Sequence, residues 1–415
     1  MNPPTRDARL LAMQVVERLT AAGHQAYWAG GCVRDLLLGH IPKDFDVATS
    51  AKPPEVQKLF RRTVAVGASF GVISVIGGPG LTIEVATFRS DGTYSDGRRP
   101  DQVTFSSAEE DAKRRDFTIN GMFFDPAKDE VLDYVGGRED LARGLIRAIG
   151  DPALRFREDK LRLLRAIRFA SRLGFGIDDE TYAALCREVD SITLVSVERI
   201  LAELRQMIEH PSRVRSIEML WSSGLFPRIY PELVAASYDR RQLDHSLAVL
   251  GFSQHAVCFA WGMAALLASI ETTQARSLVR TILHRQRASN DDIAKADWLV
   301  SHRDLWRDWV AKPTHALKRV LAHPAAADLF DLAEATERAE LGLADQVDQL
   351  RRQWGAWTPS ELDPEPLVTG KDLLDWGYSA GRIFKEILET VRDKQLDGEL
   401  DSRDEAEAFI RRRWC

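Results

Sequence analysis

The sequence predicts a mixed α/β head followed by a longer, all-α remainder. Up to about residue 150, short β-rich segments alternate with helical ones, and glycine and proline residues separate them. Beyond Asp151-Pro152, nearly every segment has the periodicity of a helix, and no alternating strand pattern is visible. Of the 415 residues, 45% are hydrophobic and 28% are charged, which is typical of a folded protein and excludes global disorder.

The head begins with an amphipathic helix, which we expect at residues 7–22. A short strand at Ala26–Ala29 then runs into Gly30-Gly31, and a helix is expected at Val33–Leu38. Further strands of the head are expected at Phe45–Ala48, Thr63–Val66, Val72–Ile76, Leu81–Phe88 and Met122–Phe124.

Within the helical remainder, Pro364, Pro366 and Gly370 set off a C-terminal segment. We expect four domains: a head at 1–150, a helical neck at 151–235, a helical body at 236–360 and a tail at 361–415. Helices are expected at 158–173, 178–188, 196–209, 212–223, 243–270, 274–287, 290–302, 315–321, 325–352 and 381–396.

Charge and cysteine usage narrow the classes of function. The net charge is −6, so any nucleic-acid site must be a local basic patch. The four cysteines lie far apart without a C-x-x-C pair, which speaks against a zinc knuckle or a disulfide framework and fits a reducing, cytoplasmic location. The N-terminus lacks an apolar segment, and no run of about 18 apolar residues occurs, so we expect neither a secretory signal nor a membrane span.

Two aspartates provide the first candidate chemistry. Asp44 and Asp46 are two residues apart in an expected strand, so both side chains are expected on one face. Neighbouring carboxylates repel each other unless a cation lies between them, and oxygen ligands without histidine or cysteine suit Mg²⁺. The alternative is an exposed, polar strand edge.

A glycine pair precedes these aspartates. Gly30-Gly31 lies between a strand and a helix, where the backbone can approach a phosphate group closely. Arg34, one turn into the helix, can add a charge-assisted hydrogen bond. A plain strand-to-helix turn is the alternative, but the D-x-D pair that starts thirteen residues after Gly31 favours a nucleotide site.

Several motifs in a fixed order resemble those of one family. The chain is similar to the class II nucleotidyltransferases, which comprise the bacterial tRNA CCA-adding enzymes and the poly(A) polymerases, within the DNA polymerase beta superfamily. The resemblance runs from about Tyr27 to Phe175 and more loosely to the end, with Gly121 where the family usually has alanine. Its motifs are Gly30–Asp35, Lys43–Val47, Ile83–Arg89, Arg114–Met122, Asp133–Gly137 and Arg155–Arg162.

The resemblance implies a polymerase-beta-like head and a two-metal mechanism. Asp44 and Asp46 would hold two Mg²⁺ ions, and Glu84 looks like the third carboxylate, although a salt-bridged strand glutamate is its alternative. The residues implied in nucleotide binding in the head are Gly30, Gly31, Arg34 and Arg115.

The segment after Phe156 bears on the choice of base. If it is one helix, Asp159 and Arg162 are neighbours, and a basic stripe follows on the same face at Arg162, Arg165, Arg168 and Arg172. A carboxylate beside a guanidinium offers an acceptor next to a donor, which matches cytosine and adenine and rejects uracil and guanine. In the family this motif is the protein template for the base. An ion pair on a surface helix is the alternative reading.

The body and tail resemble further parts of some relatives. His245 stands where a metal-dependent HD-type domain has its first histidine, but Ala268 and Ser269 replace the His-Asp pair, so we expect no phosphohydrolase activity. In the tail, Pro366–Gly370 and Gly377–Gly381 precede a helix that could meet a tRNA phosphate. A glycine-capped helical hairpin is an equal alternative.

The predicted function is template-independent addition of CCA to the 3′ end of tRNA from CTP and ATP, with no membrane or DNA partner. One alternative is a poly(A) polymerase, whose usual basic insert is missing at Val66–Gly71. An enzyme that adds only A or only CC is another, because that difference depends on a loop at about Ser90–Glu110. A non-catalytic RNA-binding module and an HD phosphohydrolase are the remaining alternatives.

Overall fold

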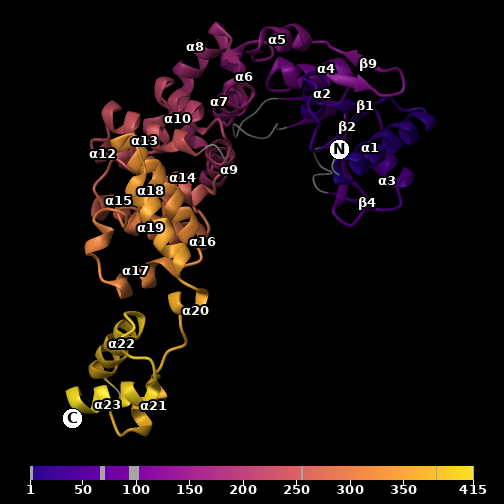
Figure 1. Cartoon of the computed structure of the whole chain (residues 1–415). Helices are drawn as coiled ribbons and strands as arrows, with labels where there is room; N and C mark the ends of the chain where they lie inside the picture. Colours follow the sequence, from indigo (N-terminus) through magenta and orange to yellow (C-terminus); the bar gives the residue numbers. More distant parts are fainter. Residues whose placement is uncertain (1–2, 66–70, 93–101, 254–255, 380, 415) are drawn as a thin grey trace. The chain divides into compact units, whose positions relative to one another are not determined.

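The computed structural model describes residues 3–65, 71–92, 102–253, 256–379 and 381–414. The chain divides into two units, one formed by Met1–Met207 with Arg215–Pro231 and the other by Ile208–Val214 with Glu232–Cys415. The first unit contains a mixed sheet with helices, and the rest of the chain is helical, which confirms the predicted fold class (Figure 1). None of the described helices contains a stretch long and apolar enough to cross a membrane.

Seven strands of the described head form one sheet in the order β3-β4-β5-β2-β1-β8-β9 (Figure 1). β2 pairs with β5 in parallel, while the other neighbours pair antiparallel. β5, which carries Glu84, therefore lies beside β2, which carries Asp46. The strands are β1 (Ala26–Ala29), β2 (Asp46–Thr49), β3 (Thr63–Val64), β4 (Val72–Gly78), β5 (Leu81–Thr87), β8 (Phe123–Asp125) and β9 (Glu130–Leu132).

Helices pack against the sheet, and β6 and β7 form a separate two-stranded sheet. α1 contacts β1 and β5, while Phe88, Ala112 and Phe123 belong to a buried apolar cluster that also contains residues of β1 and β2. The remaining head elements are α1 (Pro3–Ala21), α2 (Gly31–Leu37), α3 (Pro53–Leu59), β6 (Arg89–Asp91), β7 (Val103–Phe105), α4 (Ala108–Lys113), η2 (Thr118–Asn120), α5 (Gly137–Arg143) and β10 (Leu145–Ile146).

The expectation that Asp44 lies in the same strand as Asp46 is wrong. β2 begins at Asp46, and Asp44 precedes it outside regular structure. The reason lies in the partner strand, because Ala29 is the last residue of β1 and pairs with Asp46. Gly30 then turns the chain with a φ of +73°, so β1 offers no further pairing to Asp44.

The first unit continues with short neck helices, and the expected helix 158–173 is observed only from Arg162 onward. α6 ends at Glu158, Asp159 has extended backbone angles, and α7 begins at Arg162. The Asp159 side chain accepts a hydrogen bond from the backbone N–H of Leu161 at 3.1 Å, a local contact that competes with helix formation. These elements are α6 (Pro152–Glu158), α7 (Arg162–Leu173), β11 (Gly176–Ile177), α8 (Asp179–Glu188), η3 (Val189–Leu194), α9 (Val197–Ile208), α10 (Arg213–Ser222) and α11 (Phe226–Ile229).

The second unit is helical, and two more of the long expected helices are interrupted. The expected helix 243–270 forms α13 and α14, and 325–352 forms α18 and α19, since Gly342 ends α18 in a left-handed conformation. Its helices are α12 (Pro231–Ala235), α13 (Arg240–Phe252), α14 (Phe259–Leu266), α15 (Thr272–Arg285), α16 (Asn290–His302), η4 (Trp309–Ala311), α17 (Thr314–Leu321), α18 (Ala326–Leu341), α19 (Asp345–Ala356), α20 (Pro359–Leu362), α21 (Gly370–Asp375), α22 (Arg382–Leu396) and α23 (Arg403–Trp414).

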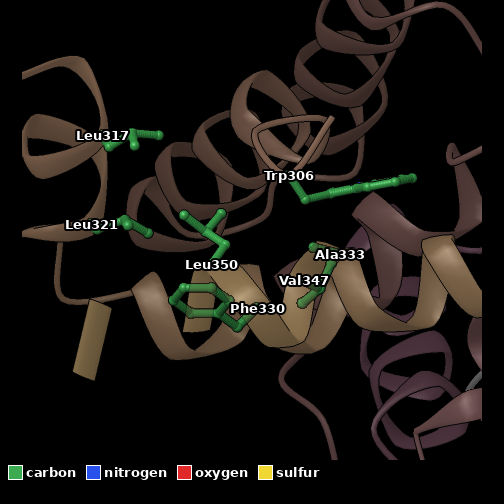
Figure 2. Close-up of a cluster of buried hydrophobic side chains, with 7 residues drawn as sticks. All are labelled: Trp306, Leu317, Leu321, Phe330, Ala333, Val347 and Leu350. Carbon is green, nitrogen blue, oxygen red and sulfur yellow. The ribbon is translucent and has the colours of Figure 1, made fainter. Parts of the chain in front are cut away.

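Buried apolar clusters hold this unit together. Figure 2 shows one of them, which consists of Trp306 together with side chains of α17, α18 and α19. A second cluster joins α21, α22 and α23 through Leu373, Ile387 and Ile410. Burial of such apolar side chains is the main favourable contribution to packing of these helices.

Candidate active site

A cavity of about 710 Å³ in the first unit gathers residues from the head and the neck. Eight basic and five acidic side chains line it, so it is locally positive in a chain of net charge −6. Such a cavity suits a polyanionic ligand that arrives with cations. Its lining residues are Gly30, Gly31, Cys32, Arg34, Asp35, Lys43, Asp44, Asp46, Arg114, Arg115, Asp116, Asn120, Asp159, Arg162, Arg165, Arg168, Phe169 and Arg172.

The glycine turn forms one wall of this cavity. Its first residue, Gly30, has a positive φ and donates its N–H to the carbonyl of Met122 at 3.2 Å. A Cβ at Gly30 would lie 3.0 Å from Nη1 of Arg115. Glycine is therefore required there both by the backbone angle and by the close approach of an arginine.

The carboxylates lie beside this turn. Pairing of Ala29 with Asp46 brings Asp46 to the end of β1, and the register of β2 and β5 sets Glu84 beside it. Asp44 and Asp46 line the cavity, whereas Glu84 is exposed on β5 outside the lining set. Loss of hydration and the negative charge of Glu84 raise the pKa of Asp46 to about 6, against the opposing effect of Arg115.

The chemistry of these donors fits Mg²⁺. All three groups are carboxylates, and their mutual repulsion, visible in the raised pKa of Asp46, is relieved by a bound cation. Within the described part of the chain, no group of three or more histidine, cysteine, aspartate or glutamate side chains lies close enough together to hold a metal ion.

Arg34 and Arg115 both contact η2. Nη1 of Arg34 donates to Oδ1 of Asn120 at 2.8 Å, and its other nitrogens donate to Asp35. Arg115 donates to the Asn120 carbonyl at 3.3 Å and to Asp111 at 3.0 and 3.2 Å. Burial alone raises the pKa of Asp111, but Arg115 and its neighbour outweigh it and hold that pKa below its ordinary value. Both arginines are thus held in place before any ligand binds.

The structure brings Asp159 and Arg162 to the same cavity but gives each a partner of its own. Asp159 accepts from Nη2 of Arg199 at 2.8 Å. Arg162, which is 8% exposed, donates to Glu158 at 2.6 Å and to the carbonyls of Arg155 and Arg114. These contacts fix the two side chains at the junction of α6 and α7.

The basic stripe of α7 is anchored by buried acids. Arg165 donates to Oδ2 of Asp116 at 2.6 and 2.8 Å, and Arg168 donates to Glu203 at 2.5 Å. Burial alone would raise the pKa of Asp116, but Arg165 and hydrogen bonds lower it to about 2. The predicted stripe is confirmed to this extent, because Arg162, Arg165, Arg168 and Arg172 all line the cavity.

The residues that hold these arginines and Asp159 were not predicted from the sequence. Asp116 and Asn120 lie within a quoted motif, but nothing in their spacing indicates their partners. Arg199 and Glu203 are four residues apart on α9, so a shared helical face was the available signal. Phe169 also lines the cavity. In the sequence it cannot be distinguished from the apolar core residues of α7 that surround it.

A separate cavity of about 480 Å³ lies in the second unit. His245, Ala268 and Ser269 line it together with Glu340, so these residues lie close together in space. Burial lowers the pKa of His245. Ala268 and Ser269 offer no histidine or carboxylate ligand for a metal at this place.

Comparisons with known proteins agree with this geometry. The family model of the poly(A) polymerase head domain matches residues 26–147, and a model described as a probable RNA- and SrmB-binding site of polymerase A matches 174–237. The fold and the cavity thus define a nucleotidyltransferase with a head of the poly(A) polymerase type. A CCA-adding enzyme of Geobacillus kaustophilus is 33% identical over 98% of this chain and 96% of its own length. The chain belongs to the family of CCA-adding enzymes.

Solved structures extend the likeness to the whole chain. A crystal structure of the Bacillus stearothermophilus CCA-adding enzyme in complex with CTP has a TM-score of 0.80 and 29% identity, covering 99% of this chain and 98% of that one. A Thermotoga maritima CCA-adding enzyme complexed with tRNA has a TM-score of 0.66 and 22% identity, covering 97% and 94%. The latter supports the fold alone.

Proposed function

We propose that this chain completes the 3′ end of tRNA by adding C, C and A from CTP and ATP in the cavity of its first unit. The observation that carries the proposal is that one cavity is lined both by Asp44 and Asp46 and by Asp159 and Arg162. The first pair suits phosphoryl transfer, and the second suits recognition of the base. The names of the relatives and the CTP complex of the Bacillus stearothermophilus enzyme support this substrate set.

Asp44 and Asp46 would hold two Mg²⁺ ions, with Glu84 as a neighbouring carboxylate. When bound, the ions supply a lowered pKa for the 3′-hydroxyl of the RNA and neutralise the charge of the triphosphate and the leaving pyrophosphate. Gly30 and Gly31 leave room for the phosphates in the cavity wall. The cations assigned to the incoming nucleotide are Arg34, Arg115, Arg165 and Arg168, all lining residues.

Base selection is assigned to Asp159 and Arg162. The described hydrogen bonds occupy both Nη1 hydrogens of Arg162 and one on Nη2, out of five donors. Donors thus remain for the ring nitrogen of cytosine or adenine, while the Asp159 carboxylate can accept from the amino group. Uracil and guanine would present a carbonyl to the carboxylate and an N–H to the guanidinium, which leaves charged groups unpaired.

The four-domain division at 150, 235 and 360 remains part of this proposal, with the neck and tail as RNA-contacting parts. A reducing, cytoplasmic location is proposed with it. That location is supported by Cys32, Cys186 and Cys258, which are free thiols in the described chain.

The proposal is tested with three tRNA transcripts that end before the first C, before the second C and before the A. Each is incubated with one labelled nucleoside triphosphate and Mg²⁺. We expect CTP incorporation on the first two transcripts and ATP incorporation on the third. Incorporation of ATP without CTP on all three would instead indicate a poly(A) polymerase. ATP incorporation on the third transcript alone would indicate an A-only enzyme, and CTP incorporation without ATP a CC-only enzyme.

Two sequence features bearing on these alternatives lie partly outside the described residues. The site of the missing basic insert includes Val66–Phe70, and the loop at Ser90–Glu110 includes residues 93–101. The described part of the loop comprises its paired ends, where β6 pairs antiparallel with β7. The nucleotide assay therefore decides between full and partial addition.

A further inference from the structure

One aromatic side chain in the cavity wall is surrounded by positive charge. Phe169 lies on α7, is 7% exposed and lines the cavity. The guanidinium carbons of Arg34, Arg165 and Arg168 lie 5.3, 5.2 and 4.3 Å from its ring centroid. We propose that Phe169 is a positioning residue that holds these three arginines in place for the nucleotide, an inference that rests on the proposed function of the cavity.

The physical basis is the attraction of a cation to the face of an aromatic ring. A guanidinium within about 6 Å of the centroid gains from the negative ring face, and the gain grows where water is excluded. The three guanidinium groups around the Phe169 ring carry like charges and repel one another, so attractive contacts must offset this repulsion. Each has an acidic partner, namely Asp35, Asp116 or Glu203, and the ring is a contact that all three share.

The ring also joins two elements that meet at the cavity. Arg34 comes from α2, directly after the glycine turn, whereas Arg165 and Arg168 come from α7. The shared contact with the Phe169 ring therefore fixes the position of Arg34, beside the glycine turn, relative to Arg165 and Arg168 of α7. A nucleotide that spans the cavity meets both groups, so their spacing decides how well its triphosphate fits.

Ordinary core packing is the competing explanation. The ring of Phe169 also packs edge-to-face against Phe117, with centroids 5.9 Å apart and an interplanar angle of 79°. Packing depends on the volume and shape of the side chain, while attraction of cations depends on the electron density of the ring. Changing the electron density at nearly constant shape therefore separates the two explanations.

The experiment uses the full-length chain with 3,4,5-trifluorophenylalanine introduced at position 169, and in parallel the variant Phe169→Leu. KM and kcat are measured for CTP and ATP on a tRNA transcript, and the Kd of inorganic tripolyphosphate is measured directly. For both variants we expect KM and Kd to rise about tenfold, with a smaller change in kcat. A tenfold change corresponds to about 1.4 kcal/mol, within the range of cation–π contacts.

Phe156→Leu is the matched control. Phe156 is fully buried on the neighbouring α6, and no guanidinium lies over its ring among the described residues. The control removes the same volume, so we expect it to lower the melting temperature while leaving the nucleotide KM within about twofold of the wild type.

Two results would overturn the proposal. One is a wild-type KM and Kd for the fluorinated chain, and the other is an equal rise of KM in Phe156→Leu and Phe169→Leu. Failure of the proposed function is distinguishable, because it appears as a wild-type chain that incorporates neither CTP nor ATP into tRNA. The tripolyphosphate Kd still tests Phe169 in that case, since it needs no transfer reaction.

Discussion

The ion pair of Asp116 and Arg165 offers a test of how the cavity is held together. Asp116 is 9% exposed, and its pKa is lowered from the ordinary 3.8 to about 2. A shift of one pKa unit corresponds to about 1.4 kcal/mol of free energy. Ionised Asp116 therefore stabilises the folded state by about 2 kcal/mol. We expect Asp116→Asn to lose this amount at pH 7, where the carboxylate of the wild type is fully ionised.

The loss is measured as hydrogen exchange of the backbone amides in the segment 116–120. The N–H of Phe117 donates to Asp116 at 2.8 Å, and the Asn120 side chain donates to the same oxygen, so this segment reports on the carboxylate directly. About 2 kcal/mol corresponds to roughly thirtyfold faster exchange in the variant than in the wild type.

The pH dependence has a defined sign. A lowered folded-state pKa contributes stability above the unfolded pKa of 3.8, and that contribution is lost as the pH falls through about 2. The ratio of exchange rates between Asp116→Asn and wild type should thus be constant above pH 5 and approach one towards pH 2. Asp190→Asn is the matched control. The ion pair of Asp190 with Arg228 is exposed, so it contributes only about 0–1 kcal/mol to the free energy of unfolding. Equal exchange of the wild type and Asp116→Asn at pH 7 would refute the reasoning.

Three further predictions concern the metal and the second unit. Asp44→Ala and Asp46→Ala should each abolish nucleotide incorporation while the circular dichroism spectrum stays unchanged, and near-normal turnover in either would contradict the two-metal assignment. Titration calorimetry should show Mg²⁺ affinity falling below about pH 6, where Asp46 takes up a proton; an affinity independent of pH from 5 to 8 would speak against it as a ligand. Phosphohydrolase activity should be absent, and metal-dependent phosphate release that survives Asp44→Ala would contradict this.

The parts of the fold and site that were predictable are those set by local patterns. Short β-rich segments located β1 and β5, and the glycine pair located the turn before α2. Spacings of three and four residues placed Arg162, Arg165 and Arg168 on one face of α7, as the structure confirms.

The remaining features depend on tertiary partners that no local pattern reports. Asp44 lies outside β2 because β1 ends at Ala29, and only the register shows that. Arg165 donates a hydrogen bond to Asp116, which is 49 residues away in the sequence, and Arg168 donates one to Glu203, which is 35 residues away. The break between α6 and α7 has a local cause, the bond from Asp159 to the Leu161 N–H, but helical periodicity on both sides conceals it.

The most direct test of base selection measures kcat/KM for all four nucleoside triphosphates on two tRNA transcripts, one that ends before the first C and one that ends before the A. The variants are Asp159→Ala and Arg162→Ala, and the control is Arg157→Ala, an exposed neighbour that pairs with Glu188 outside the cavity lining. Loss of a hydrogen bond to a charged group costs about 1.5–3 kcal/mol, or roughly 10- to 150-fold. We expect kcat/KM for CTP and ATP to fall by this factor in both variants. The preference for CTP and ATP over UTP and GTP should be lost in both variants but retained in the control. Retention of the wild-type preference in Asp159→Ala and Arg162→Ala would contradict this assignment of base selection.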